Sequence, residues 1–290
     1  MKGDLHTHST FSDGGIRIDR LPGIAAWAGM SHLAITDHDT FLSYDYALQH
    51  PQQDGVRLLP GMELSTWDTV RGQKVHLLCF YPDKTAELRS YFAEIGRRRT
   101  ECQLRSVDTL VQRYPFLKKE EILAHAADSE VLFKAHIMRT FLEYGFTDRM
   151  YGELYHQLLG KGGPAYQPVV YPVPVREVLQ MAHAARAVVI MAHPGLYGGL
   201  ELAKELATEG VIDGVEVSHP GNSPAVQIEL KNLAMQYQLI VTGGTDYHGM
   251  NEDHVCPVGS CYTASAQLER LLGLVEKRRG GGAFSSAGGL

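Results

Sequence analysis

Short apolar runs alternate with polar clusters along most of the chain. Seven runs have the length of a β-strand and end beside polar residues: 4–7, 33–36, 56–64, 75–80, 187–191, 214–218 and 239–242. Between most of them, apolar residues recur at helical spacing, as at Leu21, Ile24, Ala25 and Ala28. Alternating strands and helices indicate a parallel α/β sheet, and seven strands with polar carboxyl ends favour closure into a TIM-like (β/α)7 barrel.

The alternation breaks once, between the fourth and fifth predicted strands. Residues from about 87 to 163 carry only helical spacing, as at Leu104, Val107, Leu110 and Val111. We therefore expect a barrel in two parts, 1–84 and 166–278, with a helical insertion at 85–165 that lies near the ligand-bearing loops as a lid. The Gly-, Ser- and Ala-rich segment 279–290 is expected to be a disordered tail.

The polar clusters at the predicted strand ends contain histidine, aspartate and glutamate, whose side chains can bind metal ions. His6 and His8 alternate along one strand, so both project from the same face and can bind one ion together. The barrel model brings the carboxyl ends of all strands to one mouth. Nine ligand-type side chains would meet there: His6, His8, Asp13, His38, Glu63, His76, His193, Asp246 and His248. Such a set could hold two or three divalent ions, with imidazole and carboxylate ligands that suit manganese, iron or zinc.

Each motif alone has a plainer interpretation. A single His-x-His pair is common in proteins, and an isolated His38 or His76 is more often a polar side chain with its hydrogen bonds satisfied. Five separate clusters, each at a predicted strand end, favour metal binding. His219 follows a strand but lies outside the pattern, so it is either a residue of the rim or a substrate contact.

Composition restricts the partners. The chain has 290 residues, of which 44% are hydrophobic, and 27 basic against 33 acidic residues give a net charge of −6. No global positive field attracts duplex nucleic acid, so phosphate recognition must be local. No apolar run approaches the roughly 18 residues of a membrane span, and no signal peptide is visible. Four cysteines without a close CxxC pair indicate a reduced, cytoplasmic protein.

The same motifs resemble those of the PHP (polymerase and histidinol phosphatase) domain superfamily over most of the chain. The matching segments are Asp4-Leu5-His6-Thr7-His8-Ser9, Asp13-Gly14, Thr36-Asp37-His38-Asp39, Glu63, His76, Ala192-His193-Pro194 and Asp246-Tyr247-His248. The insertion and the segment 160–166 are similar to the branch of metal-dependent phosphoesterases that includes nucleoside 3′,5′-bisphosphate phosphatases and 5′ ribonucleases.

The resemblance implies a distorted seven-stranded barrel with three metal ions. His6, His8, Glu63 and Asp246 would bind one ion, Glu63, His76 and His193 the second, and Asp13, His38 and His248 the third. A metal-bridging hydroxide would attack phosphorus. Asp246 and His193 would thus serve catalysis directly, and Asp37 would orient a ligating imidazole.

Further side chains, most of them cationic, would have to bind the phosphate groups of the substrate. Arginine binds phosphate through two parallel charge-assisted hydrogen bonds. The candidates in and around the insertion are Arg97, Arg98, Arg99, His136, Arg139, Lys161 and Tyr166, with His219 outside it. The alternative is that the arginines lie on a solvated helix face.

The sequence and the resemblance together predict a metal-dependent phosphohydrolase. Its substrate would be a small phosphorylated compound, a nucleoside 3′,5′-bisphosphate or a short 5′-phosphorylated RNA. Three alternatives remain open: a histidinol-phosphate-type phosphomonoesterase, a metal-binding module that regulates a polymerase, and metal-assisted hydrolysis of an amide or lactone. The oligomeric state, the metals and the physiological ester are not specified by the sequence.

Overall fold

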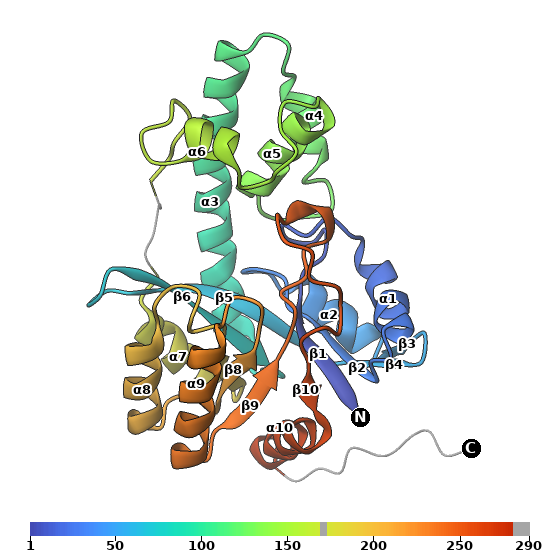
Figure 1. The fold of residues 1–290 in the computed structure, drawn as a ribbon, viewed down its shortest axis with the longest axis vertical. Coiled ribbons are helices and arrows are strands. Elements are labelled where there is room, and N and C mark those ends of the chain that lie inside the picture. Colours follow the sequence, from blue (N-terminus) through green and yellow to red (C-terminus); the bar gives the residue numbers. More distant parts are fainter. Residues whose placement is uncertain (169–172, 281–290) are drawn as a thin grey trace.

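The computed structural model of the protein describes residues 1–168 and 173–280 (Figure 1). Ten strands form two five-stranded sheets in this part of the chain. The first sheet has the order β10-β1-β2-β4-β3, with β1 (Lys2–Thr7), β2 (His32–Ile35), β3 (Gln52–Gln53), β4 (Val56–Leu58) and β10 (Thr263–Ala264). The second has the order β5-β6-β7-β8-β9, with β5 (Gly61–Asp68), β6 (Gln73–Phe80), β7 (Val188–Met191), β8 (Gly214–Ser218) and β9 (Ile240–Gly243). Most of the predicted tail, from residue 281 on, lies outside the described residues.

The prediction of a closed (β/α)7 barrel of parallel strands is wrong. Both sheets are mixed, and among the described residues no ladder closes them into a barrel. β5 pairs antiparallel with β6, and β6 pairs antiparallel with β7. The turn at residues 69–72 is the reason for the first reversal, because a parallel pair needs a crossover of about a dozen residues.

The predicted strand 56–64 is divided between the two sheets. Pro60 interrupts it, since proline has no backbone N–H to donate to a ladder. β4 before the break pairs with β2, and β5 after it pairs with β6. The chain thereby crosses from one sheet to the other, and an isolated bridge pairs His38, after β2, with Glu63 on β5.

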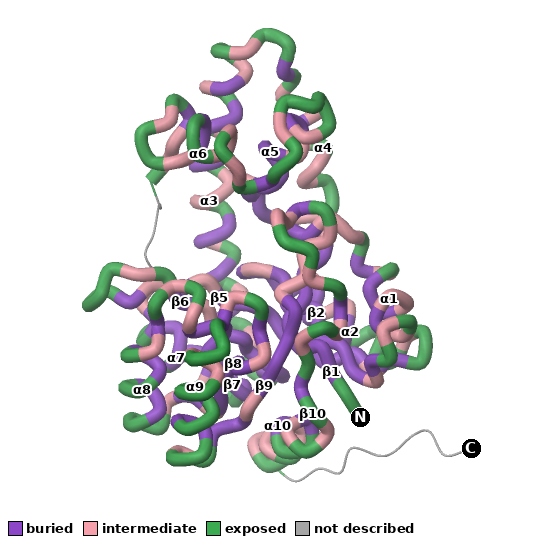
Figure 2. Tube along the Cα trace, viewed as in Figure 1, coloured by how far each residue is buried: buried purple, intermediate pink, exposed green. Residues whose placement is uncertain are grey.

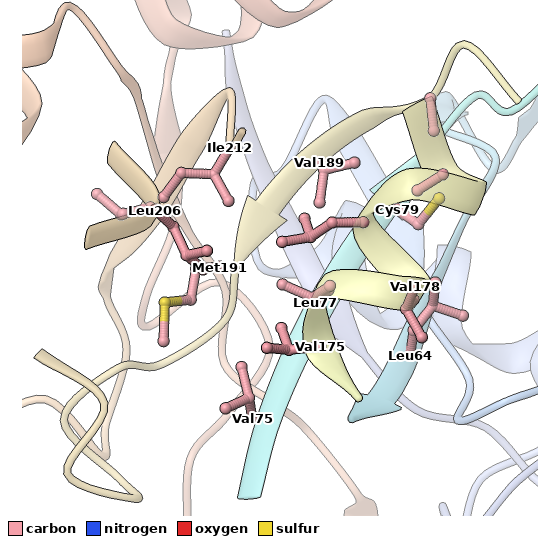
Figure 3. Packing of buried hydrophobic residues seen from close by; sticks show 14 of the residues in the cluster. Leu64, Val75, Leu77, Cys79, Val175, Val178, Val189, Met191, Leu206 and Ile212 are labelled. Atoms are coloured by element: carbon pink, nitrogen blue, oxygen red, sulfur yellow. The ribbon is translucent and has the colours of Figure 1, made fainter. Parts of the chain in front are cut away.

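Both faces of the second sheet are buried. Alternation along β6 places Leu77 in one apolar cluster and Leu78 in another. Figure 3 shows the first cluster, where Leu77, Val189 and Met191 lie near side chains of the covering helices. Three of these helices are α7 (Val175–Ala184), α8 (Leu200–Glu209) and α9 (Pro224–Tyr237). The second cluster joins the two sheets and α10 (Ser265–Arg278), so the sheets form one core.

Helices also occur near the first sheet and in the loops. They are η1 (Ile18–Arg20), α1 (Leu21–Trp27), α2 (Leu42–Gln49) and η2 (Gly249–Asn251). None of the helices in the described residues has both the length and the apolar character needed to cross a membrane.

Residues 85–165 contain helices and no strand. They form α3 (Ala86–Arg113), α4 (Lys119–Ala124), α5 (Lys134–Glu143) and α6 (Glu153–Leu159). Figure 1 shows α3 rising from the sheets with the three shorter helices beside its far part, and Figure 2 shows buried positions within this group. Leu110, Ile137 and Leu159 belong to a separate apolar cluster there. A core of its own supports our continued proposal that 85–165 is an insertion.

Candidate metal centre

The predicted ligands come from strands of both sheets and from the loops that follow strands, and they meet at one place. β1 carries His6 and leads to His8, β5 and β6 carry Glu63 and His76, and Asp246 follows β9. The structure forms four groups whose ligand atoms lie within 4.8 Å of one another: His6, His8, Glu63 and Asp246; His8, Asp13, His38 and His248; His38, Glu63 and His76; and His6, His193 and His219. All nine predicted ligands are therefore brought together.

Glu63 lies at the middle of the cluster. Its side chain is inaccessible to solvent, and each of its carboxylate oxygens faces more than one imidazole. Oε2 lies 3.1 Å from His6 Nε2, 3.2 Å from His8 Nε2 and 3.2 Å from His38 Nδ1; Oε1 lies 2.7 Å from His76 Nδ1 and 3.0 Å from His193 Nε2. This arrangement is the one expected of a carboxylate that bridges two ions.

Two further carboxylates complete the cluster. Asp246 Oδ1 lies 2.9 Å from His8 Nε2 and 3.3 Å from His6 Nε2. On the other side, Asp13 Oδ1 lies 3.3 Å from His248 Nε2. Oxygen and imidazole donors are thus mixed at each end, which suits manganese, iron or zinc.

Unpaired polar atoms provide a test of whether these residues fit metal ions. Buried nitrogen and oxygen atoms normally have hydrogen-bond partners. In this cluster the atoms without one include His6 Nε2, His8 Nε2, Asp13 Oδ1, His38 Nδ1, Glu63 Oε2 and Asp246 Oδ1. They are the atoms that face the shared space, so the donor set fits divalent ions.

The electrostatics of the cluster favour cations. Burial raises the pKa of Glu63, but the neighbouring His38, His6 and His76 outweigh it and lower the pKa well below its ordinary value. Burial acts to lower the pKa of His6, but Glu63, Glu216 and Asp246 raise it well above its ordinary value. Burial also acts to lower the pKa of His8, but Asp246 and Glu63 raise it to about 10. Glu63 and Asp246 therefore attract positive charge, which a metal ion can supply in place of a proton.

Glu216 on β8 was not predicted as a site residue. Its oxygens lie 3.1 and 3.2 Å from His6 Nδ1, and its Oε2 accepts a hydrogen bond of 3.0 Å from the His193 backbone N–H. A carboxylate that binds the second nitrogen of a ligating imidazole fixes its orientation. The available signal was a charged residue inside an apolar strand, because a buried charge needs a partner.

Within the described part of the chain, Asp37 forms hydrogen bonds with Ser9 and Ser12 and none with an imidazole. Its Oδ1 accepts hydrogen bonds from Ser9 N at 2.8 Å and Ser12 Oγ at 2.5 Å, and Oδ2 accepts one from Ser9 Oγ at 2.6 Å. It therefore holds the loop that leads to Asp13 and acts on a different group from the one we expected.

Strained backbone occurs at the ligands. His193 has φ 26° and Asp246 has φ 53°, both in the left-handed region that non-glycine residues rarely adopt. Asp39, next to His38, has φ 54°. Residues held in such conformations concentrate at functional sites, where the surrounding structure compensates the cost.

A cavity of about 590 Å³ opens beside the cluster. Asp13, His38, His76, Asp246 and His248 lie along its wall, and α3, α5 and the loop after α5 contribute other lining residues. The cavity therefore connects the cluster with the helical insertion.

The predicted substrate contacts divide into two sets. Arg98 and Arg99 line the cavity, and Arg99 Nη2 lies 2.7 Å from the buried Asp39. His219 is buried in the cluster itself, with Nε2 3.4 Å from Asp246 Oδ2. The other five, which neither line the cavity nor belong to the cluster, are Arg97, His136, Arg139, Lys161 and Tyr166.

Three of the five predicted contacts outside the cavity bind other groups of the protein. Arg97 pairs with Glu94 and Glu101 on α3, and Arg139 pairs with Glu143 on α5. His136 is buried, where Nδ1 accepts a hydrogen bond from Phe133 N and Nε2 donates one to Ser12 O at 2.9 Å. Both nitrogens of His136 are thus occupied by backbone groups.

Comparison with known proteins identifies the family. The model of the PHP domain matches residues 4–218. The chain belongs to the PHP domain family. This PHP protein is 32% identical over 250 residues to the phosphoribosyl 1,2-cyclic phosphate 1,2-diphosphodiesterase of Eggerthella lenta, covering 86% of this chain and 95% of that relative. It is 26% identical over 252 residues to the 5′-3′ exoribonuclease Rnm of Escherichia coli, with 84% of each chain covered.

Solved structures agree with this assignment. A protein from Bifidobacterium adolescentis described as a metal-dependent phosphoesterase superposes with a TM-score of 0.82 at 27% identity, over 94% of this chain and 96% of the other. An amidohydrolase from Chromobacterium violaceum superposes with a TM-score of 0.78 at 21% identity, which shows a shared fold. The prediction of a metal-dependent phosphoesterase of the PHP family is confirmed: the protein is a phosphohydrolase that depends on divalent metal ions.

Proposed function

We propose that this PHP protein hydrolyses a phosphate ester of a nucleotide, either a nucleoside 3′,5′-bisphosphate or the end of a short 5′-phosphorylated RNA. The observation that carries the proposal is the buried cluster of imidazoles and carboxylates around Glu63, open to a cavity large enough for a small molecule. Relatives that act on a phosphoribosyl cyclic phosphate and on RNA support a substrate built from ribose and phosphate.

The cluster would hold three ions, bound as the family resemblance implies. Divalent ions bound there would lower the pKa of water to give a nucleophile and would neutralise the phosphate oxygens. Manganese, iron and zinc all match the ligands. Glu63 supports the set by reaching His6, His8 and His38 with one oxygen and His76 and His193 with the other.

The chain's own residues would prepare the reaction. Glu216 fixes the His6 ring through Nδ1, so that Nε2 faces the shared space. Asp37 and His136 fix the loop before Asp13 by binding Ser12 from two sides. These contacts hold the donor atoms in place before the substrate arrives, and such preorganisation is a major source of catalytic power.

The cavity shape favours a small or single-stranded substrate. Five of the nine candidate ligands form part of the wall of a cleft that α3 and α5 also line. With a net charge of −6, no global field would draw in a duplex. We therefore propose no duplex partner, and the free thiols of all four cysteines support a reduced, cytoplasmic location.

The experiment is hydrolysis of a substrate panel by the metal-reconstituted protein. The panel contains nucleoside 3′,5′-bisphosphates, nucleoside monophosphates, short 5′-phosphorylated RNAs, histidinol phosphate, and an amide and a lactone. We expect the highest kcat/KM on a nucleotide or RNA, with loss of activity in Glu63→Gln. A preference for histidinol phosphate, or hydrolysis of the amide or lactone alone, would replace our proposal by one of the alternatives.

A further inference from the structure

The face of the second sheet that carries the candidate ligands Glu63 and His76 also carries two residues outside the metal centre, Trp67 and Lys74. On β6, Lys74 and His76 are two residues apart, so their side chains lie on the same face, about 7 Å apart along the strand. Trp67 on β5 pairs directly with Lys74, as Ser65 pairs with His76. Trp67, Lys74 and His76 all line the cavity beside the metal centre. A cation, Lys74, and an aromatic ring, Trp67, therefore lie next to the metal centre on this face.

A second lysine reaches the same cavity from the insertion. Lys134 is the first residue of α5 and lines the cavity with Lys74. The Lys134 ammonium donates a hydrogen bond to Leu159 O at 3.1 Å and lies 5.5 Å from the centre of the Tyr155 ring. Desolvation, followed by the charge of Lys74, lowers the pKa of Lys134. Both lysines therefore border the same cavity, one from β6 and the other from the insertion.

Neither lysine is neutralised by an acid. Within residues 1–168 and 173–280, no carboxylate lies within ion-pair distance of Lys74 or Lys134, and the Lys74 Nζ lies 5.6 Å from the centre of the Tyr197 ring. By contrast, the neighbouring Arg99 is paired with Asp39. Besides Asp13 and Asp246 of the metal centre, two acids line the cavity, Glu252 and Asp253, and neither is ion-paired with these lysines; Asp253 accepts hydrogen bonds from Met150 N and Tyr151 N. Two uncompensated cations in one cleft form a site that an anion would stabilise.

The Tyr197 ring contacts Lys74 and two candidate ligands of the metal centre. Its centroid lies 5.3 Å from the centre of the His76 ring, 5.6 Å from the centre of the His193 ring and 5.6 Å from the Lys74 ammonium. Lys74 therefore contacts the same tyrosine ring as the candidate ligands His76 and His193. This arrangement suits a substrate whose scissile phosphate is at the metal centre and which carries another anion elsewhere on the molecule.

We propose that Lys74 and Lys134 form an anion subsite that binds a second phosphate group of the substrate, beside Trp67. The inference rests on the proposed function, since it takes the first phosphate to lie at the metal centre. The second phosphate is either the terminal monoester of a nucleoside bisphosphate or the internucleotide diester of a short RNA. Both present the same anionic oxygens to the two lysines.

The test compares Lys74→Gln and Lys134→Gln with Lys231→Gln, which removes one exposed lysine charge on α9, outside the cavity. Kinetics are measured on adenosine 3′,5′-bisphosphate, adenosine 5′- and 3′-monophosphate, and the 5′-phosphorylated dinucleotide pApA. We expect each cavity variant to lose about ten- to hundred-fold in kcat/KM on substrates with two phosphates, chiefly through KM. The monophosphates and the Lys231→Gln control should show no such loss.

A second readout does not depend on turnover. Calorimetry on the metal-free protein should show weaker binding of adenosine 3′,5′-bisphosphate to each cavity variant, and unchanged binding to Lys231→Gln. A loss confined to the bisphosphate assigns the terminal monoester to the subsite, and a loss confined to pApA assigns the diester. Equal losses on mono- and bisphosphates, or no loss on either, overturn the subsite. A wild-type protein that hydrolyses no nucleotide refutes the proposed function instead, and calorimetry still decides the subsite.

Discussion

At the scale of single residues, the metal centre depends on close contacts that leave no space for other side chains. His6 is confined on two sides, by Glu216 at Nδ1 and by the backbone of the segment after β9. A Cβ at Gly244 would lie 2.3 Å from His6 Cβ and 2.5 Å from His6 N. The position of the first histidine is therefore set by residues more than two hundred positions away in the sequence.

Gly244→Ala should disrupt this packing. Because His6 and its backbone are in the core, the clash cannot be relieved by a flexible side chain, and we expect a loss of about 1–3 kcal/mol in stability. The matched control is Gly273→Ala on α10, where an added Cβ meets nothing within 4 Å. That change should leave stability the same or raise it by up to about 1 kcal/mol. Urea unfolding measures both, and equal stabilities for the two variants would contradict the packing at His6.

Glu216→Gln should weaken metal binding without removing a ligand. The amide retains the shape of the carboxylate but not its charge, so His6 is less basic and less firmly oriented. Replacing such a supporting group costs about 10- to 100-fold in metal affinity. Competition with a chromophoric chelator measures the affinity, with the exposed Glu229→Gln on α9 as control. Affinity equal to that of the control would show that Glu216 does not support His6.

At the scale of elements, the insertion is attached to the loops that carry the metal ligands. Thr10 Oγ1 donates to Asp128 Oδ2, Ser129 Oγ donates to Phe11 O, His136 donates to Ser12 O, and Thr40 Oγ1 donates to Glu130 Oε2. These bonds join the segment 128–136 to both sides of the centre. The insertion thus supports the loops around Asp13 and His38 as well as covering the cavity.

His136→Ala should therefore affect metal binding as well as stability. The substitution leaves Ser12 O and Phe133 N without their partners, at a cost of about 1–3 kcal/mol. Arg139→Ala, on the same helix, breaks only a surface ion pair with Glu143 and should cost less than about 1 kcal/mol. Thermal unfolding and metal titration compare the two variants. If His136→Ala bound metal like Arg139→Ala, the insertion would not position the loop before Asp13.

The elements also show what the sequence could and could not predict. The ligand-bearing ends of β1, β7 and β9 were recognisable because polar clusters follow apolar runs. The closed barrel was not supported, because strand direction depends on the connections: the turn at 69–72 forces β5 and β6 to be antiparallel, and Pro60 divides the run 56–64. The partners of His136 and Asp37 could not be predicted, since they depend on tertiary contacts between distant loops.

At the scale of the whole molecule, the metal centre joins the two sheets. Glu63 and His193 come from the second sheet, whereas His6, His8 and His38 come from strands of the first or the loops after them. Without ions, buried carboxylates and imidazoles there have unsatisfied atoms. Bound ions should thus stabilise the association of the sheets in addition to supporting catalysis.

Removing the metals should lower the melting temperature of the whole protein. Ligands that bind only the folded state stabilise it by about 2.7 kcal/mol at a hundredfold excess over Kd. Calorimetric scans before and after EDTA treatment, with dialysis and re-addition of manganese, measure the change. Unchanged melting after complete metal removal would show that the ions do not connect the two sheets energetically.

Glu63 and the histidines around it are expected to form a multinuclear metal centre. The most direct test is the metal content of the reconstituted wild-type and Glu63→Gln proteins, measured by mass spectrometry after removal of unbound ions. We expect more than one divalent ion per wild-type chain and fewer in Glu63→Gln, because the neutral amide cannot bridge two ions as the carboxylate would. A wild-type protein with no bound ion, or a Glu63→Gln protein with an undiminished metal content, would contradict it.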